Sequence, residues 1–168
     1  ARERAEKFWR DEAGLPYGRI TVPDDNVQAL IDSSVRNIWQ AREMKDGLPA
    51  FQVGPTVYRG LWIVDGAFIL ETATMLGAEE EARNGIAYML SHQKEDGRFE
   101  IIRDYHKENG IVLWACVRHA RLTRDREWLR SVWPRLEDTV AYIERLRDRT
   151  LENDTPLDDG LMPPGFPD

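Results

Sequence analysis

The fold is decided by the stretch Tyr58-Arg59-Gly60-Leu61-Trp62-Ile63-Val64-Asp65-Gly66-Ala67-Phe68. This stretch starts a predicted helix that runs to about Leu76 and is apolar almost all the way round, a pattern typical of a helix buried inside a large fold. Asp65 lies in its first turn. An ionised carboxylate in such a setting needs a partner, a wet cavity or the positive end of the helix. The stretch therefore predicts the wall of a polar ligand pocket.

The composition is that of one globular domain with a sizeable core. The chain has 168 residues, of which 42% are hydrophobic and 32% charged, and its net charge is −7. Basic and acidic residues are interleaved, so no basic stripe is expected to neutralise phosphates, and a nucleic-acid partner is not predicted. A single cysteine, Cys116, excludes an internal disulfide and a thiolate zinc cluster. No apolar run reaches 18 residues, so no membrane span is predicted.

Hydrophobic periodicity predicts five helical segments, alternately amphipathic and apolar. In chain order they are an amphipathic helix over 22–46, the apolar helix over 58–76, an amphipathic helix over 79–93, an apolar helix from 111, and an amphipathic helix over 126–149.

The remaining stretches read as connections. Residues 1–22 are a polar lead-in, residues 48–57 a loop with at most a short extended piece, and residues from 150 onward a loop rich in Pro, Gly and Asp. Pro134 is expected to kink the last helix or to begin a new segment.

This alternation is what a ring of helical hairpins requires, with inner helices packed on both sides and outer helices half exposed. The apolar helices are spaced like a repeat, because Trp114 follows Trp62 by 52 residues. A plain helix bundle would not explain the long loops before each apolar helix. In a ring those loops lie at one end, so residues 51–60, 99–110 and 150–168 are expected to converge on one face.

At these residues the chain resembles the start of the catalytic domain of six-hairpin glycosidases, the (α/α)6 toroid superfamily of glucoamylase-like, trehalase-like and rhamnosidase-like enzymes. The resemblance covers about residues 22–168. Residues 58–68 are similar to the family's Trp-x-x-Asp helix start, and residues 92–99 to its Gln-x-x-Asp-Gly turn. Residues 109–115 are similar to a Gly-x-x-x-Trp-Ala inner-helix start, and residues 122–129 complete the set.

The resemblance implies an all-α fold, an incomplete toroid with about five helices of twelve. Residues 1–22 would be a lead-in segment, and residues 23–168 the N-terminal part of the catalytic domain, ending in the loop where the sixth helix should begin. The chain by itself is therefore expected to be inactive.

The resemblance also implies that Asp65 binds hydroxyl groups of the sugar at the cleavage site and is not the proton donor. Tyr58, Arg59 and Trp62 would line the same subsite. A carboxylate can accept two hydroxyl hydrogen bonds, and such charge-assisted bonds are roughly twice as strong as neutral ones. The alternative is that Asp65 only caps its helix or forms a salt bridge, with Arg59 as a candidate partner.

Glycosidases need two carboxyl groups, one acid and one base or nucleophile. In the family the general acid lies in the loop after the fifth helix, where Asp159 and Asp168 are the candidates in this chain, and the base would come from the missing half. His106 and Glu108 precede the second apolar helix at the same end and are candidate substrate contacts, although a surface-loop role is commoner for such residues. No metal site and no cofactor are expected.

The predicted function is hydrolysis of a glycosidic bond in an oligosaccharide or glycoside by a two-carboxylate, inverting mechanism. This inference rests on analogy, since one fold hosts many chemistries. One alternative is another sugar enzyme on the same toroid: an epimerase, a phosphorylase or a lyase. A second is a non-catalytic helical-repeat module that binds a carbohydrate or a protein. The sugar, the compartment and the oligomeric state are left open.

Overall fold

The computed structural model describes residues 1–168 except 17–19, 46, 55, 152–159 and 167–168. Its elements in chain order are α1 (Arg2–Lys7), the π-helical turn η1 (Phe8–Glu12), α2 (Asp25–Gln40), β1 (Arg42–Lys45), β2 (Leu48–Phe51), α3 (Ile63–Met75), α4 (Glu79–Leu90), α5 (Lys107–Thr123) and α6 (Arg126–Leu151). The described chain is mostly helical, with one small antiparallel hairpin, so the predicted all-α class is confirmed. Closure into a toroid stays a prediction.

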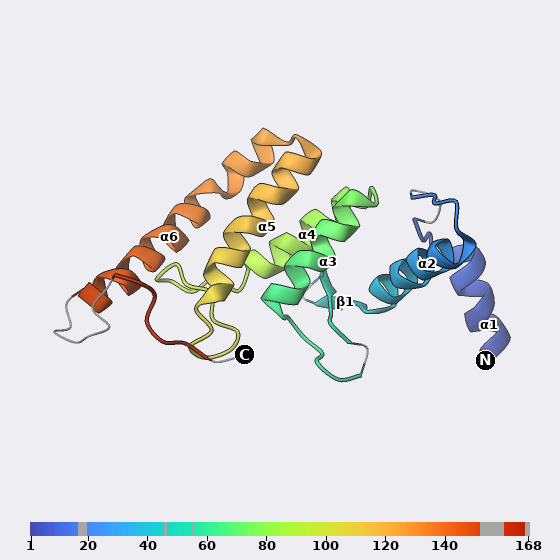
Figure 1. Ribbon diagram of the computed structural model, residues 1–168, viewed down its shortest axis with the longest axis horizontal. Coiled ribbons are helices and arrows are strands. Elements are labelled where there is room, and N and C mark those ends of the chain that lie inside the picture. The colour runs from blue at the N-terminus through green and yellow to red at the C-terminus, as the bar shows by residue number, and fades with distance from the viewer. Residues whose placement is uncertain (17–19, 46, 55, 152–159, 167–168) are drawn as a thin grey trace.

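The second half of the chain forms two consecutive helical hairpins. α3 and α5 pack against each other, α4 packs on α3, and α6 packs on α5. In Figure 1, α3 and α5 both begin at the lower edge of the molecule and run upward, and α6 returns toward the lower edge. The two helices predicted to be inner ones are thus parallel neighbours.

Small residues allow the close approach of these helices. Gly66, Ala67 and Ala73 are buried on α3 beside Leu70. On α4, a Cβ atom added to Gly85 would lie 2.3 Å from Cδ2 of Leu70. Real Cβ atoms do not approach so closely, so glycine at this position leaves room for the Leu70 side chain between α3 and α4.

The start of α3 differs from the prediction. The helix begins at Ile63 instead of Tyr58, with Trp62 as its N-cap residue in an extended conformation. Tyr58 has a φ of 56° and Gly60 a φ of 109°, both outside the helical range. The expectation of a helix buried on all sides is also wrong, because the side chains of Phe68 and Met75 are 52% and 60% exposed.

Residues 41–51 form a hairpin that the sequence pattern did not predict. α2 ends at Gln40 and not near residue 46, and β1 then pairs with β2 in antiparallel register from Arg42↔Phe51 to Lys45↔Leu48. The turn places the ring of Phe51 against that of Trp39, with their centroids 6.1 Å apart, and both side chains are buried. Burial of this aromatic pair favours the hairpin over a longer helix.

Three further boundaries differ from the prediction. The lead-in is helical over residues 2–12 and places Trp9 against the core. α5 begins at Lys107, four residues before the predicted Ile111. α6 is one helix from Arg126 to Leu151 with Pro134 inside it, so no new segment begins there.

Candidate functional site

The loops before α3 and α5 and the described C-terminal residues lie at the lower edge of the molecule in Figure 1. The loop before α5 and the described C-terminal residues are in direct contact. The backbone N–H of Phe166 donates to the carbonyl of Asp104 at 2.8 Å, and the rings of Tyr105 and Phe166 meet edge to face at 5.9 Å. The expected convergence of residues 99–110 with the C-terminal loop is therefore confirmed for the described part of that loop.

An aromatic pair lies immediately before α3. The ring centroids of Tyr58 and Trp62 are 5.2 Å apart in an edge-to-face arrangement, and Tyr58 is 60% exposed. Two of the residues predicted for one subsite are thus in contact and reachable from solvent.

Asp65 follows Trp62, the N-cap residue, by three residues and lies in the first turn of α3. Its side chain is exposed, and it has no ion pair or side-chain hydrogen bond with any residue that the structure describes. The expectation that Asp65 is buried is therefore wrong. Its carboxylate is open to a ligand, and the positive end of the α3 dipole stabilises its charge.

Arg59 does not pair with Asp65. Its guanidinium forms an ion pair with Glu43 on β1, and the next residue, Gly60, donates its N–H to Oε1 of the buried Gln52 at 2.6 Å. The alternative in which Asp65 is neutralised by Arg59 is wrong. Arg59 instead helps to hold the loop before α3 against the β-hairpin.

Glu108 is 1% exposed, in the first turn of α5. One of its carboxylate oxygens accepts a hydrogen bond from the backbone N–H of Ile101 at 2.6 Å. Burial, opposed by this bond and one from Ile102, raises the pKa of Glu108 to about 7. The Glu108 side chain thus turns inward and binds its own loop, and its contact with substrate stays a prediction.

Asn109 supports the same loop. Its Oδ1 accepts from the N–H of Phe99 at 2.8 Å, and its Nδ2 donates to the carbonyl of His106 at 2.9 Å. Phe99 is 1% exposed and belongs to the core. Glu108 and Asn109 therefore fasten the loop of residues 99–106 to the start of α5.

His106 is the N-cap residue of α5 and is half-buried. It lies beside Gly165, where an added Cβ atom would be 3.2 Å from Cδ2 of the imidazole. His106 therefore lies at the predicted edge, next to the described C-terminal residues. Asp159 and Asp168, the two candidate acids, lie outside the described residues.

Sequence reasoning did not single out the aromatic pair of Tyr105 and Phe166. Phe166 is 54% exposed, and Nζ of Lys107 lies 4.5 Å from the centroid of the Tyr105 ring. No periodic pattern connects residues so far apart in the chain, so their contact could not be read from the sequence. The lower edge thus carries two aromatic pairs, each with an exposed ring.

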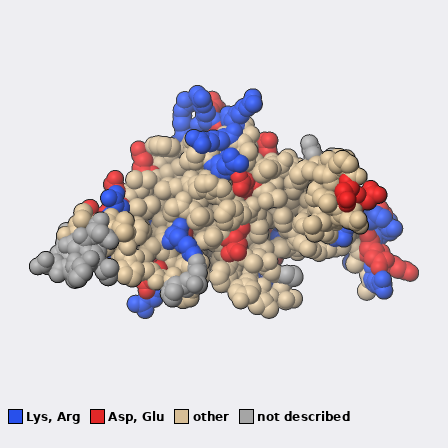
Figure 2. All heavy atoms as spheres, in the orientation of Figure 1, with Lys and Arg blue, Asp and Glu red and all other residues tan. Residues whose placement is uncertain are grey.

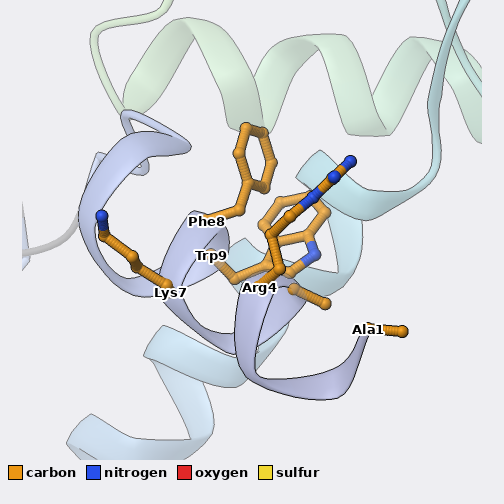
Figure 3. A pocket seen from close by; sticks show the side chains of 6 residues that line it. Ala1, Arg4, Lys7, Phe8 and Trp9 are labelled. Carbon is orange, nitrogen blue, oxygen red and sulfur yellow. The ribbon is translucent and has the colours of Figure 1, made fainter.

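A separate pocket lies at the N-terminal end of the chain, on α1 and η1. Figure 3 shows its lining, which consists of Ala1, Arg4, Ala5, Lys7, Phe8 and Trp9. The lining offers cationic and aromatic groups without a carboxylate, so this pocket does not suit chemistry that needs two carboxyl groups.

Among the described residues no group of three or more His, Cys, Asp or Glu is arranged to hold a metal ion. The described helices include none that is long and apolar enough to cross a membrane. No model of a known protein family matches the chain, and neither curated proteins nor solved structures show a match to it.

Proposed function

We propose that the chain carries part of the sugar-binding end of a six-hairpin glycosidase-like domain, whose complete form hydrolyses a glycosidic bond in an oligosaccharide. One observation carries the proposal: Asp65, whose exposed carboxylate pairs with none of the described residues, follows Trp62 by three residues, and the Trp62 ring contacts that of Tyr58. A carboxylate beside exposed aromatic rings suits a sugar, because its hydroxyl groups need acceptors and its C–H faces stack on rings.

The parallel arrangement of α3 and α5 supports this proposal. Both begin at the same edge, so residues before each helix can contribute to one binding surface. Asp65 would accept hydrogen bonds from two hydroxyl groups. Tyr58 and Trp62 would shield those bonds from water.

The hydrolytic step needs two further groups, an acid that protonates the leaving oxygen and a base that activates water on the opposite face of the sugar ring. In this proposal the acid comes from the loop that contains Asp159, or from Asp168. The base comes from the other half of the complete toroid. Inversion at the anomeric carbon is part of the proposal and rests on the family resemblance alone.

Binding is the property to test first. The native chain and Asp65→Asn would be applied to an array of gluco-, manno-, galacto- and rhamno-configured trisaccharides, with tryptophan fluorescence as a second readout. We expect the native chain to bind one configuration of sugar. Asp65→Asn should bind that sugar at least about tenfold more weakly, because the substitution removes a pair of charge-assisted hydrogen bonds. Trp62→Ala should weaken binding similarly.

Asp25→Asn is the matched control, since Asp25 is an exposed acid in the first turn of α2. It should leave sugar binding unchanged. Equal effects of the Asp65 and Asp25 substitutions, or no binding to any sugar on the array, would contradict the proposal.

A second candidate is carbohydrate binding without hydrolysis. One observation favours it: of the two acidic residues predicted to contact substrate, Asp65 and Glu108, only Asp65 is open to solvent. Release of nitrophenol from nitrophenyl glycosides by a longer form of the protein would separate the two candidates, since a binding module releases none.

A further inference from the structure

Four arginines gather at the turn between α5 and α6, at the end of the molecule opposite the candidate sugar site. They are Arg121, Arg124, Arg126 and Arg130, here called the arginine turn, and all four are exposed. Figure 2 shows Lys and Arg side chains concentrated at the upper edge, where Figure 1 places this turn. Such a concentration is unexpected on a chain with a net charge of −7.

Within the described residues, these arginines form no ion pair with a neighbouring carboxylate. Asp125 lies between them, but its carboxylate accepts from the N–H of Trp128 at 2.9 Å and from the guanidinium of Arg83 at 2.7 Å. The hydrogen bond from Trp128 is the main reason that the pKa of Asp125 is lowered. Throughout the described part of the chain, no carboxylate forms an ion pair with any of the four arginines.

Two of the four occupy positions where folding alone favours another residue. Arg124 has a φ of 59° and a ψ of 21°, the left-handed region that glycine or asparagine adopts at lower cost. Arg126 is the first residue of α6, at the positive end of the helix dipole, where an acidic residue would be more stable. A residue that is unfavourable for its local backbone conformation, and that brings no compensating contact, indicates a function.

The turn is hollowed. A shallow depression of about 540 Å³ is lined by Arg83, Arg124, Arg126 and Arg130, by the acids Glu79, Asp125 and Glu127, and by Thr123. Arg83, one of the lining residues, is held from behind by Trp128, because its guanidinium lies 5.7 Å from the centroid of the indole ring. The depression is therefore a shaped surface with guanidinium groups on a fixed turn.

We propose that the arginine turn is a docking site for an acidic segment of another protein. Each guanidinium can bind one carboxylate through two parallel hydrogen bonds, and arginine is enriched in protein interfaces. The rim carboxylates of Glu79 and Glu127 disfavour the dense charge of a polyphosphate or a nucleic-acid backbone. A protein segment can space its acids to meet the arginines and avoid the rim.

The test uses a fluorescein-labelled twelve-residue peptide of alternating Glu and Gly, followed by fluorescence anisotropy. The native chain should bind it saturably at about 20 mM salt and more weakly at about 150 mM, since surface charge pairs are screened. Arg126→Glu/Arg130→Glu should bind at least about tenfold more weakly. The fold should survive, because glutamate suits the first turn of a helix, and circular dichroism checks this.

Arg4→Glu/Arg10→Glu is the matched control, with the same change in net charge on exposed residues of α1 and η1. It should change peptide affinity by less than about twofold. Equal losses in the two double variants would mean that net charge alone attracts the peptide and would overturn the proposal, as would the absence of binding to the native chain.

Two other results would also overturn it. Inorganic tripolyphosphate could displace the labelled peptide at a lower concentration than unlabelled peptide does. That result would assign the turn to a phosphate ligand. A dimer of the native chain in sedimentation that Arg126→Glu/Arg130→Glu abolishes would assign it to a second copy of this chain. We expect neither.

Discussion

Glu108 and Ile101 are joined by a hydrogen bond of 2.6 Å from the backbone N–H of Ile101 to a carboxylate that is 1% exposed. The bond crosses the end of the loop before α5 and ties it to the first turn of the helix. Asn109 makes the equivalent bond to Phe99. Adjacent helical residues thus hold the loop at two points, and this support positions His106 at the candidate site.

The buried carboxyl of Glu108 makes stability depend on pH. Its pKa is raised to about 7 in the folded chain from 4.5, mainly by burial, so the folded state binds its proton more tightly than the unfolded state. Its contribution to the free energy of unfolding is fully present below pH 4.5 and is lost as the pH rises through 7. Between pH 4.5 and 7 we expect this contribution of Glu108 to fall by about 1.4 kcal/mol per pH unit.

Glu108→Gln tests whether Glu108 causes this pH dependence. The amide oxygen of the variant can still accept the hydrogen bond from Ile101, but the side chain cannot ionise. Urea unfolding at several pH values should show that the free energy of unfolding of Glu108→Gln rises relative to that of the native chain by about 1.4 kcal/mol per pH unit between pH 4.5 and 7. Glu80→Gln, on the exposed face of α4, is the control and should leave the profile unchanged. Parallel profiles for native chain and Glu108→Gln would refute the assignment.

His119 should act in the opposite direction. It is 2% exposed, its Nδ1 lies 3.1 Å from Oγ1 of Thr74, and burial, aided by Arg83, lowers its pKa to about 4 from 6.5. The folded state binds this proton less tightly than the unfolded state. The contribution of His119 is therefore present above pH 6.5 and is lost as the pH falls through 4, again by about 1.4 kcal/mol per pH unit.

Between pH 4.5 and 6.5 the two groups oppose each other, so the native profile should be nearly flat there. Glu108→Gln should expose the His119 slope, with stability rising with pH, and His119→Gln should expose the Glu108 slope, with stability falling. The double variant should be flat again. Unfolding profiles in which His119→Gln also rises with pH would contradict this cancellation.

Periodicity predicted the core helices because burial of an apolar face determines them. α4 matches its predicted start at Glu79, and the apolar segment of α3 was recognised, although its first residues were assigned one turn too early. The hairpin over 42–51 was missed because contact between Trp39 and Phe51 decides it, and strands of four residues are too short to show a clear period.

The candidate site was only partly predictable. Tyr58 and Trp62 are in contact and Asp65 follows in the first turn of α3, an arrangement of close neighbours in the chain that spacing reveals. The inward turn of Glu108 depends on its bond to Ile101. The arginine turn was not predicted for a similar reason. Acids and bases alternate in the sequence, and only the structure shows that the carboxylate of Asp125 is hydrogen-bonded to Trp128 and Arg83 instead of to these arginines.

The turn before α5 is docked on α6 through a glycine. Gly97 has a φ of 86°, and an added Cβ atom would lie 2.3 Å from the carbonyl oxygen of Asp138. Nε2 of Gln93 also donates to Oγ1 of Thr139 at 2.9 Å, which fixes the turn on the helix. Gly97→Ala should therefore lower the free energy of unfolding by more than about 2 kcal/mol, from left-handed strain plus a backbone clash.

Gly110→Ala is the matched comparison. Gly110 is exposed inside α5, and an added Cβ atom would meet nothing within 4 Å. Because glycine weakens a helix interior, this variant should be more stable than the native chain by about 0.5–1 kcal/mol in urea unfolding. A loss of stability would mean that residue 110 lies in the predicted loop and not in the helix.

Pro134 tests the continuity of α6. It is exposed in the third turn of the helix, and it leaves the carbonyl of Arg130 without the usual N–H donor. Pro134→Ala should restore that bond and raise the free energy of unfolding by about 1–3 kcal/mol, with a rise in the thermal midpoint of about 2–4 °C for each kcal/mol. Glu137→Ala, exposed on the same helix, should change the free energy of unfolding by no more than about 0.5 kcal/mol. A Pro134→Ala variant that unfolds at a lower temperature than the native chain would show that the proline stabilises a boundary between two helical segments, as the sequence pattern alone allowed.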